Sequence, residues 1–279
     1  MNNPVLTAFN GAWDYDRQAR IQAQVAQRLA QGLEAYDPQA PLWGLELGCG
    51  TGFFSRLWLE RLPHTRLLIT DMAPAMVQRA HDNLNCFPAC NKSFVVMDAE
   101  NLCLRTSFDL IAASLVFQWF RQPECSLPSL FKLLRPEGRL LFATLGPDTF
   151  REWRDLCARY QIPCGLHPYP DRNDWMQLAA RHDMTLTLSE EHLEETHPSP
   201  KAFLRRLKAI GAKTPLPGHQ PVAPGIFRPM LTTTSATGQP FMVTHHIIFG
   251  TMMHPPSARE QKLRQASHPH HPCQEILPP

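Results

Sequence analysis

The fold class is decided by Leu45-Glu46-Leu47-Gly48-Cys49-Gly50-Thr51-Gly52. This stretch begins in an apolar, strand-like segment, 43–47, and leads into a helix-like segment, 53–62. Glycine at alternate positions removes the Cβ atoms, so the chain can turn through positive φ and a ligand can approach the backbone closely. The stretch therefore predicts a ligand-binding loop between a buried strand and a helix.

On both sides of this loop, short apolar segments alternate with helix-length segments. The predicted strands are 43–47, 66–70, 93–97, 108–114, 139–145, 184–190 and 241–250, and the predicted helices are 13–35, 53–62, 74–84, 126–135, 148–160, 171–182 and 199–210. Strands that are apolar almost throughout and separated by helices are typical of a parallel sheet covered on both faces. The sequence thus predicts an α/β fold.

Composition excludes several classes of protein. The chain has 279 residues, 43% of them hydrophobic, which is enough to form a sizeable core. No apolar run is long enough to span a membrane and no secretory signal is evident, so we expect a cytoplasmic protein. A net charge of +2 gives no indication of a nucleic-acid partner. The eight cysteines form no CxxC pair, and we expect reduced, mostly buried thiols and no metal site.

The spacing of the glycines distinguishes two classes of ligand. A dinucleotide-binding Gly-x-Gly-x-x-Gly loop would place its last glycine at position 53, which is Phe53. The segment instead resembles the acid-x-Gly-x-Gly-x-Gly loop of class I S-adenosylmethionine (SAM) methyltransferases, with Glu46 as the acid. SAM carries a sulfonium cation rather than phosphates, so an acidic residue here is favourable. The resemblance implies a Rossmann-like, mostly parallel seven-stranded sheet with helices on both faces.

Polar groups follow the next three predicted strands, at the edge where open α/β sheets bind ligands. Asp71 ends the second strand, where a carboxylate can accept hydrogen bonds from both ribose hydroxyls; the alternative is that it caps the following helix. Asp98 follows the third strand, and the resemblance implies that it faces the adenine amino group; a solvated strand-end acid is the alternative. Ser114 ends the fourth strand.

Four further stretches resemble the malonyl-[acyl-carrier-protein] O-methyltransferase family of biotin synthesis. They are 9–16 leading to Gln22, 114–120 with its Gln-Trp pair, 142–150 with its Gly-Pro-Asp-Thr run, and 207–212, which resembles part of the family's C-terminal insertion. The resemblance covers about residues 8–250. The Pro-rich segment 212–229, interpreted as a long connection, and the tail rich in His and Pro depart from the family pattern.

The resemblance implies a reaction that needs no general base. The family methylates the free carboxylate of a malonyl thioester, carried by acyl-carrier protein or, as an analogue, by CoA, and such a carboxylate is already ionised at neutral pH. Catalysis would then rest on positioning the reactants and excluding water. The alternatives are a methyltransferase for another small carboxylic acid or a quinone, and a SAM-binding protein without activity.

The resemblance also implies which residues form the site. Cofactor contacts are expected from Gln22, Glu46, Gly48, Cys49, Gly50, Gly52, Asp71, Met72, Asp98, Ala99 and Ser114. Positioning is expected from Tyr15, Gln118 and Trp119, with ordinary packing as the alternative. The basic stretch of Arg205, Arg206 and Lys208 is expected to dock an acidic carrier protein, with a solvated helix face as the alternative. No metal is expected.

Three regions are predicted. Residues 1–36 form an N-terminal helical lid, 37–254 form the methyltransferase domain with an insertion at about 196–238, and 255–279 form a Pro/His-rich, disordered tail. In the last predicted strand, alternation places one of His245 and His246 toward the core and the other toward solvent, and we interpret both as structural.

Overall fold

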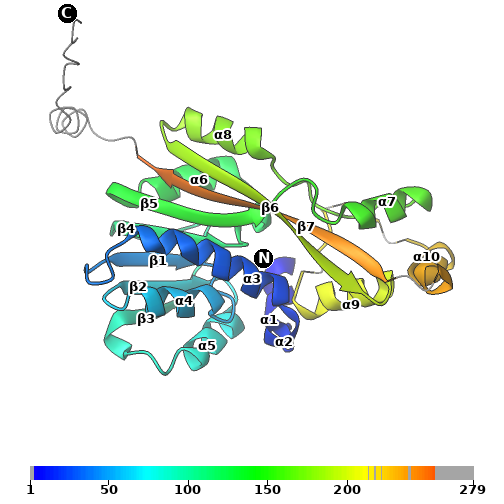
Figure 1. Ribbon diagram of the computed structural model, residues 1–279, viewed down its shortest axis with the longest axis horizontal. Coiled ribbons are helices and arrows are strands. Elements are labelled where there is room, and N and C mark those ends of the chain that lie inside the picture. Colours follow the sequence, from blue (N-terminus) through cyan, green and yellow to red (C-terminus); the bar gives the residue numbers. More distant parts are fainter. Residues whose placement is uncertain (1–2, 213, 217, 221, 238–239, 255–279) are drawn as a thin grey trace, which may run out of the picture.

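The computed structural model describes residues 3–212, 214–216, 218–220, 222–237 and 240–254 (Figure 1). The predicted disordered tail, 255–279, lies outside them. Seven strands form one sheet in the order β3-β2-β1-β4-β5-β7-β6. They are β1 (Trp43–Leu47), β2 (Arg66–Asp71), β3 (Lys92–Val96), β4 (Phe108–Ser114), β5 (Leu134–Leu145), β6 (Thr185–His197) and β7 (Phe241–Met253). β7 pairs antiparallel with both β5 and β6, and the other four pairs are parallel, so the predicted mostly parallel sheet is confirmed.

Helices cover both faces of this sheet. They are α1 (Pro4–Asn10), α2 (Tyr15–Gln18), α3 (Arg20–Leu29), α4 (Phe53–Arg61), α5 (Pro74–Asn83), α6 (Pro123–Phe131), α7 (Arg151–Arg159), α8 (Arg172–Arg181), α9 (Pro200–Ala209) and α10 (Pro224–Thr237), with 3₁₀ turns η1 (Ala30–Ala35), η2 (Ala89–Asn91) and η3 (Phe117–Trp119). One core lies between the sheet and α3, α4 and α5, and a second lies between the sheet and α6 and α8. Within the described residues, none of the helices has the length and apolar character needed to span a membrane.

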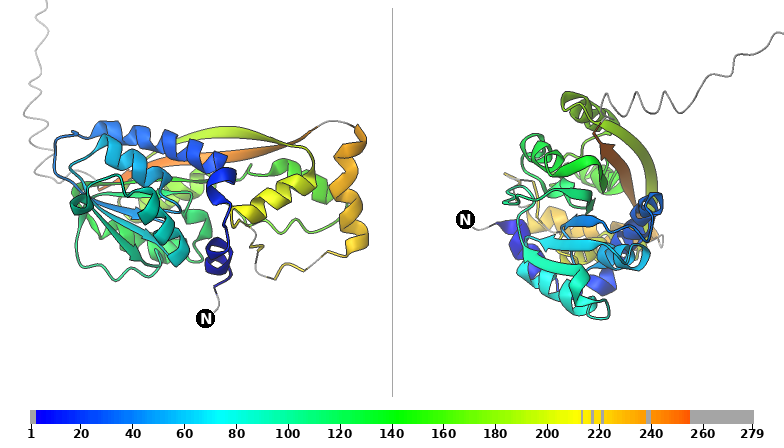
Figure 2. Two further views of the ribbon diagram at one scale, coloured as in Figure 1. Left: turned by 90° about the horizontal axis from the view of Figure 1, so that it is seen from below. Right: turned by 90° about the vertical axis from the view of Figure 1, so that its left-hand side faces the viewer.

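The β6–β7 hairpin extends well beyond the parallel strands. Its two strands pair along their full length, from Thr185 with Met253 to His197 with Phe241. The extended end contacts α7, α9 and α10, which form a third apolar cluster there (Figure 2). The predicted insertion, 196–238, includes α9 and α10 and lies at this end, whereas the segment predicted as a lid forms α1, α2, α3 and η1.

Several predicted boundaries are wrong. The helix predicted at 126–135 begins earlier, at Pro123, because proline fits the first turn of a helix, and it ends at Phe131. Leu134 already pairs with Phe108 in the sheet, so β5 begins there. The helix predicted at 13–35 is interrupted at Ala19, and the connection predicted at 212–229 contains the start of α10.

Candidate functional site

The glycine-rich loop lies at the carboxyl end of β1. Gly48, Gly50 and Gly52 all have positive φ, at 61°, 54° and 93°, which other residues rarely adopt. A Cβ atom on Gly48 would also come within 2.5 Å of the Val116 side chain. Glycine is therefore required by the backbone at these positions, and Gly52 is the N-cap residue of α4. The predicted loop between a strand and a helix is confirmed.

Asp71 fixes this loop to the end of β2. Its Oδ2 atom accepts a hydrogen bond from the Gly50 amide at 2.9 Å, and Oδ1 accepts one from the Ala73 amide at 2.8 Å. Burial raises the pKa of Asp71 to about 6, although these amide hydrogen bonds oppose the shift. The carboxylate thus already holds the turn before α5. Met72, beside it, is half-buried.

Glu46 is buried in β1, directly before the loop, with 1% of its surface exposed. The Ser55 hydroxyl donates a hydrogen bond to its carboxylate at 2.5 Å. Burial raises the pKa of Glu46 to about 8, which makes the protonated form the prevalent one at neutral pH. A cationic ligand nearby would favour the ionised form. Thr51, in the same loop, has a buried hydroxyl with no hydrogen-bond partner among the described residues.

The N-terminal segment lies against the loop. Tyr15 stacks on Phe53 with ring centroids 6.3 Å apart, and its hydroxyl would be 3.6 Å from a Cβ atom on Gly50. Burial, followed by the nearby Asp71 carboxylate, raises the pKa of Tyr15. Tyr15 and the loop are therefore brought together by the fold. Cys49 is a buried thiol whose pKa burial also raises. Among the cysteines whose burial the structure describes, three are exposed, so the prediction of mostly buried thiols is wrong; they are Cys86, Cys103 and Cys125.

The remaining predicted cofactor residues lie at the same edge of the sheet, with one exception. Asp98 holds a turn just beyond β3, accepting hydrogen bonds from the Glu100 amide at 2.9 Å and the Asn101 side chain at 2.8 Å. Ala99 lies in that turn, and Ser114 is the half-buried last residue of β4. Gln22 lies elsewhere: it lines a cavity of 10 Å³ together with residues of β6, β7 and α9.

Gln118 and Trp119 follow β4 in η3. The Gln118 amide donates to the Leu115 carbonyl at 2.7 Å, and its oxygen accepts from the Thr144 hydroxyl at 3.4 Å. Trp119 lies edge-on to Phe9, 5.6 Å between centroids, and 6.4 Å from the His167 ring. The sequence does not predict that Thr144 contacts Gln118 or that His167 contacts Trp119. Both contacts depend on how distant segments pack, and no local pattern indicates them.

The basic stretch in α9 does not form one face. Arg205 and Lys208 are exposed, but Arg206 turns inward, where it forms an ion pair with Glu195 and donates to the Gln18 carbonyl at 2.8 Å. Its side chain is 11% exposed. Arg206 is therefore not available to dock a carrier protein, because its guanidinium is held inside the molecule by the Glu195 carboxylate and the Gln18 carbonyl.

Comparison with known proteins agrees with this fold. Residues 45–140 match a family model described as a methyltransferase domain. A solved N-methyltransferase, NodS from Bradyrhizobium japonicum bound to S-adenosylhomocysteine, has a similar fold, with a TM-score of 0.50 and 16% identity over 90% of this chain and 99% of that one. The predicted Rossmann-like class I methyltransferase fold is confirmed.

Two curated relatives match nearly the whole described chain. A malonyl-[acyl-carrier protein] O-methyltransferase of Magnetococcus marinus is 38% identical, with 89% of this chain and 92% of that protein covered. A biotin biosynthesis bifunctional protein of Bordetella avium is 36% identical over 90% of this chain, and the match spans 52% of that longer protein. The chain therefore belongs to the malonyl-[acyl-carrier protein] O-methyltransferase family of class I methyltransferases.

Proposed function

We propose that this enzyme transfers the methyl group of SAM to the free carboxylate of malonyl-acyl-carrier protein, giving the methyl ester, as an early step of biotin synthesis. The observation that carries the proposal is its 38% identity to a malonyl-[acyl-carrier protein] O-methyltransferase over 89% of the chain. A cytoplasmic location is part of the proposal, as is the absence of nucleic-acid and membrane partners.

The residues at the carboxyl edge of the sheet fit SAM. The loop has no Cβ atom at Gly48, Gly50 or Gly52, and the buried Thr51 hydroxyl lacks a hydrogen-bond partner among the described residues. When bound, SAM supplies an electrophilic methyl group on a sulfonium. We assign its amino-acid end to the loop and its ribose to Asp71, and we assign its adenine to the turn of Asp98 and Ala99. Further contacts are proposed for Glu46, Cys49, Met72 and Ser114. Gln22 is left out of this proposal because it lies between α9 and the β6–β7 hairpin.

Asp71 has a double role in this proposal. Each of its oxygens already accepts one backbone amide hydrogen bond, and a carboxylate oxygen has capacity for a second. Ribose hydroxyls would therefore be bound by a group that the loop has already oriented. Such preorganisation lowers the entropic cost of binding.

The substrate side is proposed to lie at η3. Gln118 is oriented by two hydrogen bonds, and Trp119 packs between the N-terminal segment and His167. These groups would position a carboxylate and exclude water, which is sufficient for a nucleophile that is ionised without help. Tyr15, from the proposed lid 1–36, would close the same space. Arg205 and Lys208, in α9 of the proposed insertion 196–238, are the remaining candidates for docking the carrier protein.

The test is intact-mass spectrometry of malonyl-acyl-carrier protein incubated with the purified enzyme and SAM. We expect the mass to increase by one methyl group, with no increase on an acetyl-carrier protein, which lacks the free carboxylate. Malonyl-CoA in a parallel reaction tests whether the carrier protein is needed. If SAM binds but the malonyl carrier gains no mass, the substrate assignment is wrong, and other small carboxylic acids, quinones or a non-catalytic role replace it.

A further inference from the structure

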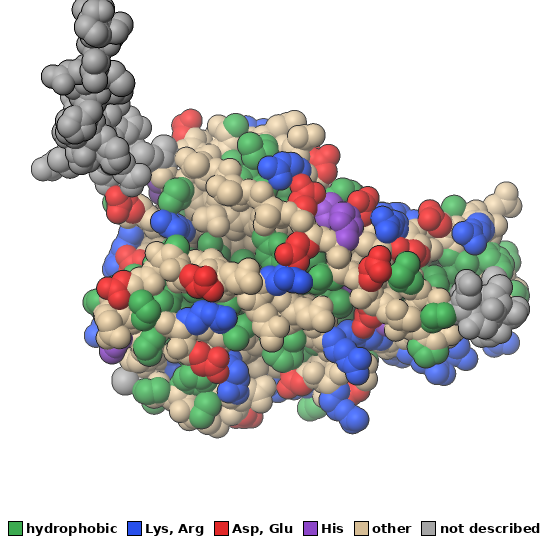
Figure 3. Space-filling view, viewed as in Figure 1, with side chains coloured by type: hydrophobic (Ala, Val, Ile, Leu, Met, Phe, Trp, Pro, Cys, Tyr) green, Lys and Arg blue, Asp and Glu red, His purple; other side chains and the backbone are tan. Residues whose placement is uncertain are grey.

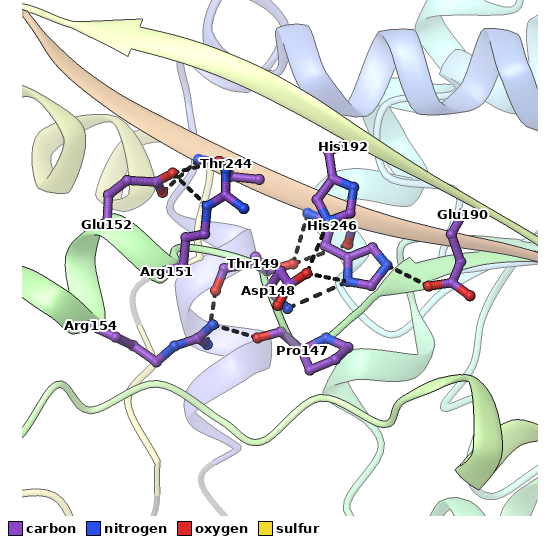
Figure 4. Close-up of polar contacts among 10 residues, drawn as sticks. All are labelled: Pro147, Asp148, Thr149, Arg151, Glu152, Arg154, Glu190, His192, Thr244 and His246. Carbon is purple, nitrogen blue, oxygen red and sulfur yellow. Dashed lines mark hydrogen bonds and ion pairs between the residues drawn. The ribbon is translucent and has the colours of Figure 1, made fainter.

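A cluster of two histidines and an aspartate lies away from the glycine-rich loop, where β6, β7 and the connection after β5 meet (Figure 4). Asp148 Oδ2 lies 3.0 Å from His192 Nε2 and 3.8 Å from His246 Nδ1. One potential ligand atom from each of the three residues lies within 4.8 Å of the others. We call Asp148, His192 and His246 the His/Asp cluster.

The fold orients His246 in this cluster. Only 4% of its surface is exposed, and its Nε2 atom lies 2.9 Å from a Glu190 carboxylate oxygen. If Nε2–H donates to Glu190, Nδ1 keeps its lone pair and faces Asp148 and His192. The Asp148 amide, 3.4 Å from Nδ1, fits the same tautomer. The ring also lies so close to Gly146 that a Cβ there would be 2.6 Å away.

His192 completes the arrangement from the neighbouring strand. It pairs directly with His246 across β6 and β7, and the two rings stack with centroids 4.4 Å apart and an interplanar angle of 19°. The His192 side chain is 44% exposed and that of Asp148 52%, so an ion has access from solvent. Figure 3 shows histidine side chains at the surface in this region, beside acidic and basic ones.

We propose that the His/Asp cluster binds a divalent transition-metal ion, with Zn²⁺ as the best candidate. Two imidazoles and one carboxylate suit zinc, whereas Mg²⁺ and Ca²⁺ prefer oxygen ligands. The two stacked rings would have to tilt toward each other for both nitrogen lone pairs to reach one ion at about 2.0–2.2 Å, and the half-exposed His192 has room to make this movement. A metal-bound histidine commonly donates its other ring N–H to a carboxylate, which orients the ring. Glu190 would do this for His246. Solvent fills the fourth position.

Such an ion would link parts of the chain that are distant in sequence. Asp148 lies in the Gly-Pro-Asp-Thr run just after β5, while the two histidines belong to the extended hairpin. Thr144, which hydrogen-bonds Gln118, lies near the end of β5 only four positions before Asp148. A bound metal would therefore rigidify the connection between the hairpin and the proposed substrate side. The sequence predicted no metal because no local spacing brings these three residues together.

The experiment is Co²⁺ and Zn²⁺ titration of the full chain, comparing the wild type with His192→Gln. Co²⁺ gives visible absorption when histidine nitrogens bind it, and calorimetry gives the Zn²⁺ affinity. We expect the wild type to bind at the cluster and His192→Gln to bind at least about tenfold more weakly at that site. Zn²⁺ should also raise the melting temperature of the wild type and not that of the variant. Because His192 is half-exposed, the variant is expected to fold.

Two controls make the result specific. His81→Gln removes another exposed histidine that lies 3.4 Å from a carboxylate, Asp82, and it should bind metal as the wild type does. Replacing His268, His270 and His271 with Asn removes the histidines of the C-terminal segment and should leave the cluster's signal in place. The proposal is overturned if wild type and His192→Gln bind equally, or if only the triple variant loses binding.

Discussion

At the scale of single residues, Glu46 predicts a pH-dependent stability. Its pKa is about 8 in the folded protein, against 4.5 for an ordinary Glu, so the folded state holds a proton that the unfolded state has lost. Stability from this group is therefore complete below about pH 4.5 and is lost as the pH rises toward 8. We expect the melting temperature of the ligand-free wild type to fall over that range, and to fall several degrees less in Glu46→Gln.

The comparison isolates Glu46 because other titrating groups are present in both proteins. The pKa of Asp71 is raised to about 6, so this group also makes the folded protein less stable as the pH rises, over a lower range from about pH 4 to 6. Ser55→Ala removes the hydroxyl that favours the ionised carboxylate, so its melting temperature should fall more steeply with pH than that of the wild type. Parallel curves for wild type and Glu46→Gln would show that Glu46 is ionised when folded.

At the scale of elements, the N-terminal segment is held over the loop by contacts to α5. Arg79 donates to the Ala12 carbonyl at 2.5 Å and lies over the Trp13 ring at 4.9 Å, and the Ala75 amide donates to Asn10 at 3.2 Å. Arg79→Met should loosen the segment, because the lost hydrogen bond and cation–π contact are together worth about 1–3 kcal/mol. We expect several-fold weaker SAM binding and faster hydrogen exchange in residues 4–18.

Arg61→Met serves as the matched control for this prediction. Arg61 ends α4 and its hydrogen bond, to the Leu57 carbonyl at 3.5 Å, stays within its own helix. This variant should bind SAM as the wild type does. If Arg79→Met increases exchange in the N-terminal segment without weakening SAM binding, the segment is ordinary packing and the proposed lid is wrong.

At the scale of the whole molecule, the sequence predicts those features that depend on neighbouring residues in the chain, such as the glycine-rich loop and the apolar strands. The glycine spacing predicts the loop. The bounds of β1 and β4 are predicted correctly because each is a short, mostly apolar run, a pattern that is visible in the local sequence alone. The second half of β6, 191–197, is not predicted because Leu193 is its one apolar residue, and only the pairing with β7 identifies it as a strand. His245 and His246 are both buried, whereas the alternation predicts one facing solvent, because each side of β7 is packed: His245 lies against Phe150 and His246 against His192.

The inward position of Arg206 could not be predicted from the sequence either. Arg205 and Arg206 are adjacent and identical in type, and only the tertiary structure turns one inward and leaves the other exposed. It joins Glu195 of β6 to the Gln18 carbonyl of α2, and so links the beginning of the chain to its last third. His197 and His245 lie 3.3 and 3.5 Å from the same Glu195 carboxylate, but with Arg206 in place burial lowers the pKa of both, that of His245 to about 3, so they carry no charge there. Removing Arg206 therefore takes away the permanent positive charge beside a carboxylate that is 14% exposed.

We expect Arg206→Gln to lower the free energy of unfolding by about 3 kcal/mol, the usual cost of breaking a buried ion pair on one side. Urea denaturation measures this loss, and hydrogen exchange should rise in both α2 and α9. Arg205→Gln, one position away on the exposed face, should change stability by no more than about 0.5 kcal/mol. Adding Glu195→Gln to Arg206→Gln should restore part of the loss, because the unpaired charge is then removed as well. If the double variant is no more stable than Arg206→Gln, the cost comes from packing of the arginine side chain and not from the stranded carboxylate.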